Sequence, residues 1–409
     1  MKIIKKFLRL GGEGSEEDYK GAVGPRPLLP NPPPKILVVA GEASGDHHAA
    51  RLVAAIRKRL PGAQFFGVGG EALAAQGVRI LCPAHELAVV GLSEVTERLP
   101  AVARALRAIG KVIREEKPRL AILVDFPDFN FWVARLAKYR GVKVMYYISP
   151  QVWAWRTYRV RTIARLVDRM VVIFPFEEEF YRSKGVPAVF VGHPFRETLP
   201  PSVPREVLLK KWGLSPERFT VALLPGSRGS EISRHLPIML AAAELITRAL
   251  PGTQFILPLA STTPAEMVHG LTTSFTGILC IIGGQSFQTL TAAHVAVAAS
   301  GTATLEAALA GTPTVIIYRV SPLTFQVGRL MVRVNHIGMA NLLAGEGMFP
   351  ELIQEDCNPE RIAQEVINLI KDPERLEALR RGLTRIINDL GEPGASARAA
   401  QVALELIKG

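Results

Sequence analysis

The stretch KILVVAGEASGDHHAARLVAAIRKRL, residues 35–60, contains the pattern that decides the fold. It begins with KILVVA (35–40), in which an apolar run follows Lys35, and this is typical of a strand buried on both faces of a parallel sheet. A polar loop, GEASGD (41–46), follows, and residues 47–60 carry apolar side chains at helical spacing. The stretch therefore predicts a strand, a loop and a helix, the repeating unit of a doubly wound α/β sheet.

The same pattern recurs along both halves of the chain. The N-terminal half repeats it at Leu120–Val124, VKVMYYI (142–148) and RMVVIF (169–174). After the Pro-rich stretch 193–204, the C-terminal half shows it at FTVALL (219–224), FILPLA (255–260), ILCII (278–282), HVAVAA (294–299) and TVIIY (314–318). Strands that alternate with helices indicate parallel sheets, so the sequence predicts an α/β protein with two Rossmann-like, doubly wound domains joined by a Pro-rich hinge.

Domain boundaries follow from this pattern. Residues 1–34 are expected to be an N-terminal tail and Pro-rich linker, residues 35–200 the first Rossmann-like domain, and residues 201–372 the second. Residues 373–409 have helical periodicity that is broken at residues 391–394, and these helices are candidates for packing back on the first domain.

The composition indicates a large folded core and an anionic partner. Of the 409 residues, 48% are hydrophobic, which excludes disorder for most of the chain. An excess of 49 Lys and Arg over 37 Asp and Glu gives a net charge of +12, which favours nucleic acid, an anionic membrane surface or a phosphorylated small molecule as partner. Cys82, Cys280 and Cys357 have no CxxC spacing, so neither a disulfide framework nor a zinc site is indicated, and a reducing cytoplasm fits best.

Two segments raise the question of a membrane span or a signal peptide. Residues 267–305 contain no Asp, Glu, Lys or Arg, but their apolar pieces are only of strand length and are separated by the polar GGQSFQT, which argues against a span. The N-terminal MKIIKKFLRL is basic, yet Lys5, Lys6 and Arg9 interrupt its apolar residues, so no signal-peptide core is expected.

The loop LLPGSRGSE (223–231) has the composition of a phosphate site. Gly226 and Ser227 form a turn whose backbone NH groups can approach an anion, and Arg228 supplies a fixed guanidinium. The alternative is an ordinary turn between a strand and a helix, with a surface arginine.

A second candidate loop is SGTATLEAALAG (300–311). Ser300, Gly301 and Thr302 begin a helix whose N-terminus favours negative charge, and Glu306 shares a helix face with Thr302, so its carboxylate can accept hydrogen bonds from ribose hydroxyls. The alternative is a small-residue helix packed on its sheet, with Glu306 solvated or ion-paired. Neither loop contains GxxxxGK[ST] or GxGxxG, so ATP hydrolysis and NAD-dependent hydride transfer lose support.

Polar residues also follow two strands of the N-terminal half. They are Glu42, Ser44 and Asp46 in GEASGD, and Asp125, Asp128 and Asn130 in VDFPDFN. A carboxylate enclosed by the aromatic residues of FPDFNFW can have a raised pKa and act as a general base on a hydroxyl. Asp125 is the stronger candidate because it is nearer the strand end, whereas Asp128 is favoured as a cap of the following helix.

Histidines and basic aromatic residues elsewhere favour simpler interpretations. His47, His48, His193 and His235 lack metal-ligand spacing, so capping and packing are the default, and no metal site is expected. The segment WAWRTYRVRTIAR (153–165) mixes aromatic residues with arginines, but no RNA- or DNA-binding module signature accompanies it, and no nucleic-acid partner is expected.

Six motifs together resemble the lipid-A-disaccharide synthase family over nearly the whole chain from Lys35: GEASGD, VDFPDFN, YYISPQVWAW, LLPGSR, SGTATLE and NLLAG. The resemblance implies the two-domain GT-B architecture and an inverting glycosyltransferase that needs neither metal nor cofactor. It implies transfer of 2,3-diacylglucosamine from UDP-2,3-diacylglucosamine to 2,3-diacylglucosamine 1-phosphate (lipid X), which gives the β-1,6 tetraacyl disaccharide 1-phosphate and UDP. It further implies a cytoplasmic enzyme, peripheral on the inner face of the bacterial inner membrane, with homodimer formation left open.

The same resemblance implies roles for individual residues. Asp125 is the candidate base for the acceptor's 6-hydroxyl, and Arg228 the candidate for neutralising the UDP leaving group. The UDP side would also use Gly226, Ser227, Ser300, Gly301, Thr302, Glu306 and the Asn341 of NLLAG, and the acceptor side Glu42, Ser44, Asp46 and Asn130. A UDP-sugar 2-epimerase of the same fold is the main alternative, and a non-catalytic lipid carrier is a third.

An amphipathic helix is predicted at RLPAVARALRAIGKVIREEK (98–117). Apolar residues at helical spacing form one stripe, and basic residues lie largely elsewhere: Leu99, Val102, Leu106, Ile109 and Ile113 against Arg104, Arg107 and Lys111. A core-packed stripe is favoured, and the basic face is the candidate surface for an anionic membrane.

Overall fold

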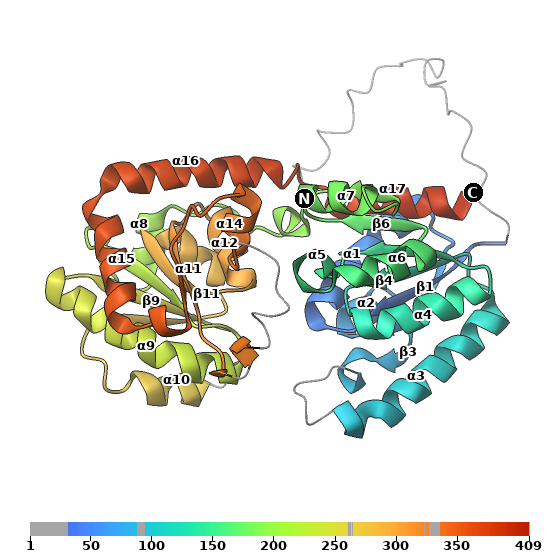
Figure 1. Ribbon diagram of the computed structural model, residues 1–409, viewed down its shortest axis with the longest axis horizontal. Coiled ribbons are helices and arrows are strands. Elements are labelled where there is room, and N and C mark those ends of the chain that lie inside the picture. Colours follow the sequence, from blue (N-terminus) through green and yellow to red (C-terminus); the bar gives the residue numbers. More distant parts are fainter. Residues whose placement is uncertain are drawn as a thin grey trace, which may run out of the picture.

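The computed structural model describes residues 32–87, 95–260, 263, 265–322, 324–326 and 336–408. These residues form two lobes, each built on a parallel β-sheet that is packed between helices (Figure 1). The predicted two-domain α/β architecture is therefore confirmed.

The N-terminal lobe contains a sheet whose strand order changes direction next to the candidate base. Its strands are β1 (Lys35–Ala40), β2 (Gln64–Gly69), β3 (Arg79–Pro83), β4 (Leu120–Val124), β5 (Lys143–Tyr147), β6 (Arg169–Val172) and β7 (Ala188–Phe190). They lie side by side in the order β3-β2-β1-β4-β5-β6-β7. The order reverses between β1 and β4, where Ala40 pairs with Val124. Open parallel sheets bind ligands at the carboxyl ends of strands at such a switch point.

The C-terminal lobe repeats this arrangement. Its strands are β8 (Thr220–Leu224), β9 (Gln254–Leu259), β10 (Ile278–Gly283), β11 (Val295–Ala299), β12 (Thr314–Tyr318) and β13 (Glu351–Ile353). Their order is β10-β9-β8-β11-β12-β13, so the switch point lies between β8 and β11, where Leu224 pairs with Ala298. Both loops with phosphate-site composition therefore begin at this switch point.

Helices cover both sheets. Those of the N-terminal lobe are α1 (Ala43–Arg59), α2 (Glu71–Ala75), α3 (Val95–Glu116), α4 (Pro127–Tyr139), α5 (Val152–Trp155), α6 (Val160–Leu166) and α7 (Pro175–Arg182). The rest are α8 (Arg205–Lys211), α9 (Gly229–Ala249), α10 (Ala265–Thr272), α11 (Ser286–Ala292), α12 (Thr302–Leu309), α14 (Met339–Ala344), α15 (Pro359–Lys371), α16 (Pro373–Asp389) and α17 (Ala395–Lys408). Because helices pack on both faces of each sheet, a central strand such as β4 is wholly apolar and fully buried.

The amphipathic helix predicted before β4 is α3. Ala105, Ile109 and Ile113 are buried in the core of the N-terminal lobe, while Arg104, Arg107 and Lys111 are exposed. The core-packed interpretation of its apolar stripe is confirmed. Leu99 lies outside the residues whose side chains the structure describes.

The chain crosses between the lobes a second time near its end. Helix α16 lies along the C-terminal lobe, and α17 packs against α1 of the N-terminal lobe (Figure 1). The two crossing segments touch, because the amide of His193 donates a hydrogen bond to the carbonyl of Leu390 (2.9 Å). The Glu197 carboxylate then anchors the start of α17 by accepting from the amide and hydroxyl of Ser396, each at 2.6 Å.

Candidate active site

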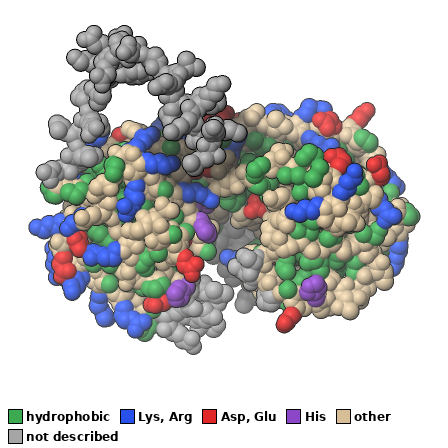
Figure 2. Space-filling view, turned by 180° about the vertical axis from the view of Figure 1, so that it is seen from behind, with side chains coloured by type: hydrophobic (Ala, Val, Ile, Leu, Met, Phe, Trp, Pro, Cys, Tyr) green, Lys and Arg blue, Asp and Glu red, His purple; other side chains and the backbone are tan. Residues whose placement is uncertain are grey.

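Two adjoining cavities lie at the carboxyl ends of the strands, where the lobes face each other across a hollow (Figure 2). The larger, of about 500 Å³, is lined by Ser44, His48 and Asp125 of the N-terminal lobe and by Met339 and other residues of the C-terminal lobe. The second, of about 440 Å³, lies within the C-terminal lobe. Residues 300–302 line both cavities, so a molecule bound in one can reach the other.

The loop after β8 is held closed by Glu231 of α9. Gly226 has a left-handed φ of 115°, and a Cβ there would lie 2.3 Å from Oε2 of Glu231, so only glycine fits. That oxygen accepts hydrogen bonds from the amides of Ser227 (3.1 Å) and Arg228 (3.4 Å). The Glu231 carboxylate therefore already holds these two amides, and an anion that approached them would compete with it.

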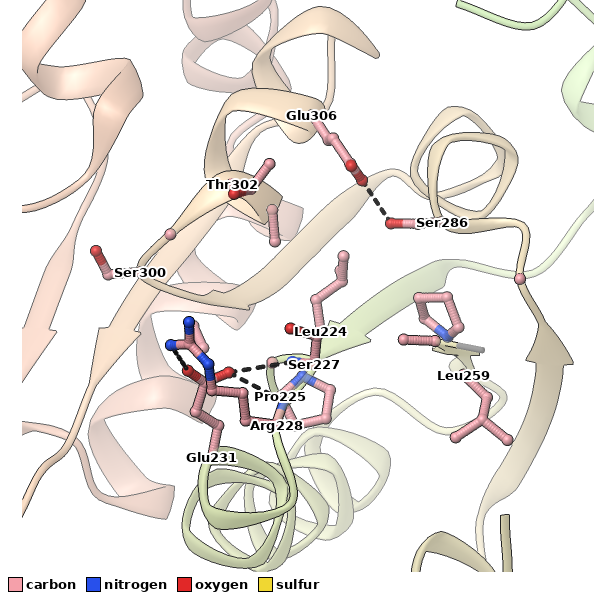
Figure 3. Close-up of a pocket in the computed structure, with 17 residues that line it drawn as sticks. Leu224, Pro225, Ser227, Arg228, Glu231, Leu259, Ser286, Ser300, Thr302 and Glu306 are labelled. Carbon is pink, nitrogen blue, oxygen red and sulfur yellow. Dashed lines mark hydrogen bonds and ion pairs between the residues drawn. The ribbon is translucent and has the colours of Figure 1, made fainter. Parts of the chain in front are cut away.

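The positive charge at this loop comes instead from Arg228. Its side chain is 73% exposed and lies at the wall of the second cavity, with Nη1 3.3 Å from Oε1 of Glu231 (Figure 3). An ion pair this exposed contributes little to stability, so the guanidinium can turn toward a bound anion at low cost.

The second predicted loop also lies at this cavity. Gly301 is the N-cap of α12 and supplies no side-chain acceptor, so the positive end of the helix dipole faces the cavity wall. Glu306, one turn into the helix, accepts a 2.7 Å hydrogen bond from the Ser286 hydroxyl, and burial raises its pKa. Figure 3 shows Glu306 on the opposite side of the pocket from Arg228, so the two could contact opposite ends of a nucleotide.

Asp125 lies at a strained strand end. Asp125 and Phe126 have φ angles of 46° and 49°, in the left-handed region that bulky residues rarely adopt. The Asn130 amide donates to the carbonyls of Val124 (3.2 Å) and Asp125 (2.6 Å), and the Tyr146 hydroxyl also donates to the Asp125 carbonyl (2.6 Å). These bonds hold the turn, and the turn places Asp125 at the wall of the interlobe cavity.

The surroundings of Asp125 make its carboxylate more basic. Burial, with a further contribution from the Glu42 carboxylate, raises the pKa of Asp125 to about 6, although a hydrogen bond from the Phe126 backbone opposes the shift. At neutral pH it is therefore still ionised and can accept a proton. Asp128 is different: it is 73% exposed and pairs with Arg159 at 2.6 Å. The favoured capping role for Asp128 is wrong, because Phe126 is the N-cap of α4.

Of the other four candidates for the acceptor side, two lie near Asp125 and two form hydrogen bonds to the protein backbone. Ser44 lines the interlobe cavity, and Glu42 is exposed and close enough to Asp125 to influence its pKa. Asp46 is instead buried, and its carboxylate accepts from the amides of Gly70 (2.7 Å) and Ala72 (2.9 Å). Asn130 is also buried and bonds the strained turn, so neither it nor Asp46 is among the residues that line the interlobe cavity.

Asn341 likewise forms its hydrogen bonds within the protein. It is fully buried, its amide donates to the Phe349 carbonyl (2.9 Å) and to Oε1 of Glu351 (2.8 Å), and its Oδ1 accepts from the Phe349 amide (2.8 Å). Glu351 in turn accepts from the amides of Ile337 and Gly338. The expected direct contact with the donor is not supported by this geometry, in which Asn341 positions the segment before α14 that lines the cavity.

Glu177 is a buried carboxylate beside the interlobe cavity that the sequence does not single out. Glu177 accepts hydrogen bonds from the Ser149 hydroxyl (2.6 Å), the Trp153 indole (3.0 Å) and the Phe174 amide (3.2 Å). Burial raises its pKa to about 7. Because Trp153 and Phe174 line the interlobe cavity, Glu177 fixes the wall that SPQVWAW forms. The only sequence signal is its position three residues after Phe174, a capping-box spacing.

The histidines mostly follow the default interpretation. His193 accepts from the Phe195 amide (3.2 Å), and His235 bridges the Pro225 carbonyl (3.0 Å) and the Arg319 amide (3.2 Å). His48 and His193 both line the interlobe cavity, and burial lowers their pKa values to about 4 and about 3. Among the described residues, no group of three or more His, Cys, Asp or Glu side chains is arranged to hold a metal ion.

Comparisons with known proteins agree with the motifs. A family model described as lipid-A-disaccharide synthetase matches residues 36–406. A lipid-A-disaccharide synthase from Syntrophus aciditrophicus is 47% identical over 91% of this chain and 98% of its own. Among solved structures, a UDP-GlcNAc 2-epimerase from Neisseria meningitidis bound to UDP-GlcNAc has a TM-score of 0.62 at 13% identity, covering 91% of this chain and all 100% of that one. The calicheamicin glycosyltransferase CalG4 has a TM-score of 0.60 at 15% identity, covering 92% and 98%. These two show the fold alone.

Proposed function

This chain belongs to the lipid-A-disaccharide synthase family, and we propose that its two adjoining cavities hold the acceptor and the UDP-sugar donor. The enzyme transfers 2,3-diacylglucosamine from its UDP derivative to lipid X, releasing UDP. The proposal depends on one observation above all: Asp125, with its raised pKa, faces a cavity that continues through residues 300–302 into the pocket of Arg228.

The chemistry proposed for this geometry is a single inverting displacement. The Asp125 carboxylate takes the proton of the acceptor's 6-hydroxyl as that oxygen forms a bond to C1 of the donor sugar. The bond from C1 to the β-phosphate oxygen breaks, and its electron pair leaves with UDP. Arg228 and the N-terminus of α12 offset the negative charge that grows on the diphosphate. Glu306, across the pocket from Arg228, is the proposed acceptor of hydrogen bonds from the ribose.

The acceptor side is proposed to use the wall formed by the N-terminal lobe. Ser44 lies beside the base as a hydrogen-bond partner for the acceptor sugar, and Glu42 tunes the base through its charge. Asn130 and Glu177 act indirectly, because each holds a segment that contacts the cavity.

A UDP-sugar 2-epimerase is not favoured. The epimerase likeness is one of fold at 13% identity, whereas the synthase likeness is 47% over nearly the whole chain. The reaction separates the two, since a synthase needs an acceptor before UDP is released.

The test of the function is UDP release from UDP-2,3-diacylglucosamine with and without lipid X. We expect UDP and a tetraacyl disaccharide 1-phosphate to form only when both substrates are present. UDP released at the same rate without lipid X would indicate an epimerase or hydrolase, and binding of lipid X with no product under any condition would indicate a carrier.

Acylated substrates also require contact with a membrane, which we propose is peripheral and electrostatic. No helix in the described ranges is long and apolar enough to cross a bilayer. The exposed basic face of α3, with Arg104, Arg107 and Lys111, is suited to an anionic surface, because each such charge near the surface contributes about 1 kcal/mol at low salt.

Changing Arg104, Arg107 and Lys111 together to Gln is expected to weaken co-sedimentation with anionic vesicles at low salt. The loss should shrink at high salt, where screening already removes the attraction. The matched control changes Arg375, Arg381 and Arg385 to Gln, because these are three exposed arginines on one helix, α16, of the other lobe. Equal binding by the α3 variant and the wild type at low salt would show that α3 does not face the membrane.

A further inference from the structure

The exposed aromatic side chains of this protein are concentrated in one part of the N-terminal lobe. Within the ranges that the structure describes, the exposed large aromatic residues are Trp132 (56% exposed), Tyr139 (83%), Trp155 (39%) and Tyr158 (69%). They lie on α4, on α5 and on the 3-10 turn Thr157–Arg159 that follows it. Since α4 also packs against α6, which follows that turn, these segments form one surface (Figure 1).

Arginines lie against these rings. The guanidinium of Arg135 is 5.0 Å from the ring centre of Trp132, and that of Arg156 is 3.8 Å from Trp155. The stretch from residue 127 to residue 166 contains eight Lys or Arg and a single acidic residue, Asp128. Asp128 is paired with Arg159, and Lys138 with Asp168, so the remaining cations leave these segments with an excess of positive charge. Aromatic rings with a polar edge, flanked by cations, are suited to the interface of an anionic bilayer.

Part of this surface is the rim of the interlobe cavity. Trp155 lines that cavity together with Asp125. Asp128, in the first turn of α4, forms ion pairs with Arg159 (2.6 Å) and Arg156 (3.6 Å). These ion pairs connect α4 to the segment that carries Trp155 and Tyr158. Trp132 lies one turn farther along α4 than Asp128, whereas Tyr139 is at the far end of the helix, about 10 Å from Trp132 by helical rise.

We propose that Trp132, Trp155 and Tyr158 form an interfacial patch that dips into an anionic phospholipid surface at the mouth of the acceptor cavity. This inference rests on the proposed function, since it places the lipid entrance beside the candidate base. The patch lets an acylated acceptor move from the bilayer to Asp125 without exposing its chains to water. The basic face of α3 then supplies longer-range attraction, and the aromatic rim supplies the contact.

The test compares Trp132 and Tyr158 with Tyr139. The double variant W132A/Y158A removes two rim aromatics that do not line the cavity, and Y139A removes a still more exposed tyrosine at the far end of the same surface. Binding is measured by co-sedimentation, without substrates, on vesicles of phosphatidylglycerol mixed with phosphatidylcholine. We expect the double variant to bind about tenfold more weakly, and Y139A to bind within about twofold of the wild type.

Three outcomes would overturn the proposal. The first is a folded double variant that binds vesicles as tightly as the wild type does. The second is a loss of vesicle binding in Y139A as large as that in the double variant, which would mean that the rim is not the contact. The third is loss of binding to a single-stranded RNA oligonucleotide with vesicle binding intact, which would assign the surface to nucleic acid. Substitutions this exposed are expected to leave thermal unfolding almost unchanged, which serves as the folding control.

An activity measurement separates this proposal from the proposed function. With a short-chain, water-dispersed acceptor, W132A/Y158A is expected to turn over like the wild type, while with the acceptor embedded in vesicles its kcat/KM is expected to fall about tenfold. If the wild type itself transfers no sugar to the dispersed acceptor, the proposed function fails. The proposed membrane contact is tested separately, by the vesicle-binding measurement, which needs no substrate.

Discussion

Replacing Asp125 by Asn is expected to lower kcat by about a hundredfold to ten-thousandfold while leaving UDP affinity unchanged, because the variant loses the proposed general base but keeps the proposed nucleotide pocket. Asp125 lines the interlobe cavity and is not among the residues of the pocket that holds Arg228. Turnover and UDP affinity are measured by a UDP-release assay and a titration. Turnover within about threefold of wild type would remove Asp125 from the mechanism.

The substitution is well matched to the strained turn. Asn tolerates the left-handed conformation that Asp125 adopts, so the backbone bonds from Asn130 and Tyr146 are expected to persist. Since the folded state raises the pKa of Asp125, its contribution to stability is greatest below the unfolded value and is lost as pH rises through about 6. The neutral Asn avoids that loss, so thermal unfolding at neutral pH should show no destabilisation.

The pH profile gives an independent check of the same assignment. A base must be deprotonated, so kcat/KM is expected to rise with pH through about 6 and then to level off. With an aspartate of ordinary pKa as the base, this rise in kcat/KM would occur near pH 4. The limb should be absent from the residual activity of the Asn variant. Glu177, whose pKa is raised to about 7, can add a second inflection that the Asn variant would retain.

The architecture could be predicted because buried parallel strands have a simple sequence signature. ILVVA (36–40) and LAILV (120–124) are covered by helices on both faces, so every side chain in them is apolar and the runs stand out. Once the strands are known, their carboxyl ends are known too, and the loops with chemistry follow. The same logic predicted the two candidate phosphate loops and Asp125 at the carboxyl ends of strands, and the strand order puts those ends at the switch points of the two sheets.

What each polar residue does within those loops could not be predicted. Asp46 and Asn341 belong to the same motifs as cavity residues, yet both are buried and bond backbone groups. The left-handed turn at Asp125 and Phe126 depends on a ring that packs over Gly41, where a Cβ would lie 2.2 Å from the Phe126 side chain. Sequence gives the residue type and its approximate place. Whether a side chain faces the cavity or the scaffold depends on such contacts between distant segments.

Replacing Arg228 by Ala is expected to damage both UDP binding and catalysis, unlike the change at Asp125. In the proposed mechanism, the guanidinium meets the diphosphate in the ground state and again when charge develops on the leaving group. Loss of a charged hydrogen-bonding partner is expected to weaken UDP binding by roughly tenfold to a hundredfold, and kcat should fall by about a further hundredfold.

The surroundings of Arg228 explain why the expected effect is so large. The neighbouring amides of Ser227 and Arg228 are held by Glu231, so the side chain is the principal cation that this loop offers to the diphosphate. Without it, the Glu231 carboxylate would face the phosphates with less compensation. Arg248 provides the matched control: it is 75% exposed, pairs with Glu244 on the same helix, and lies about 30 Å along α9 by helical rise. Arg248→Ala should leave titration and turnover unchanged. If UDP binds Arg228→Ala as tightly as the wild type, the diphosphate does not contact this arginine, and the helix dipole of α12 would have to offset the leaving-group charge by itself.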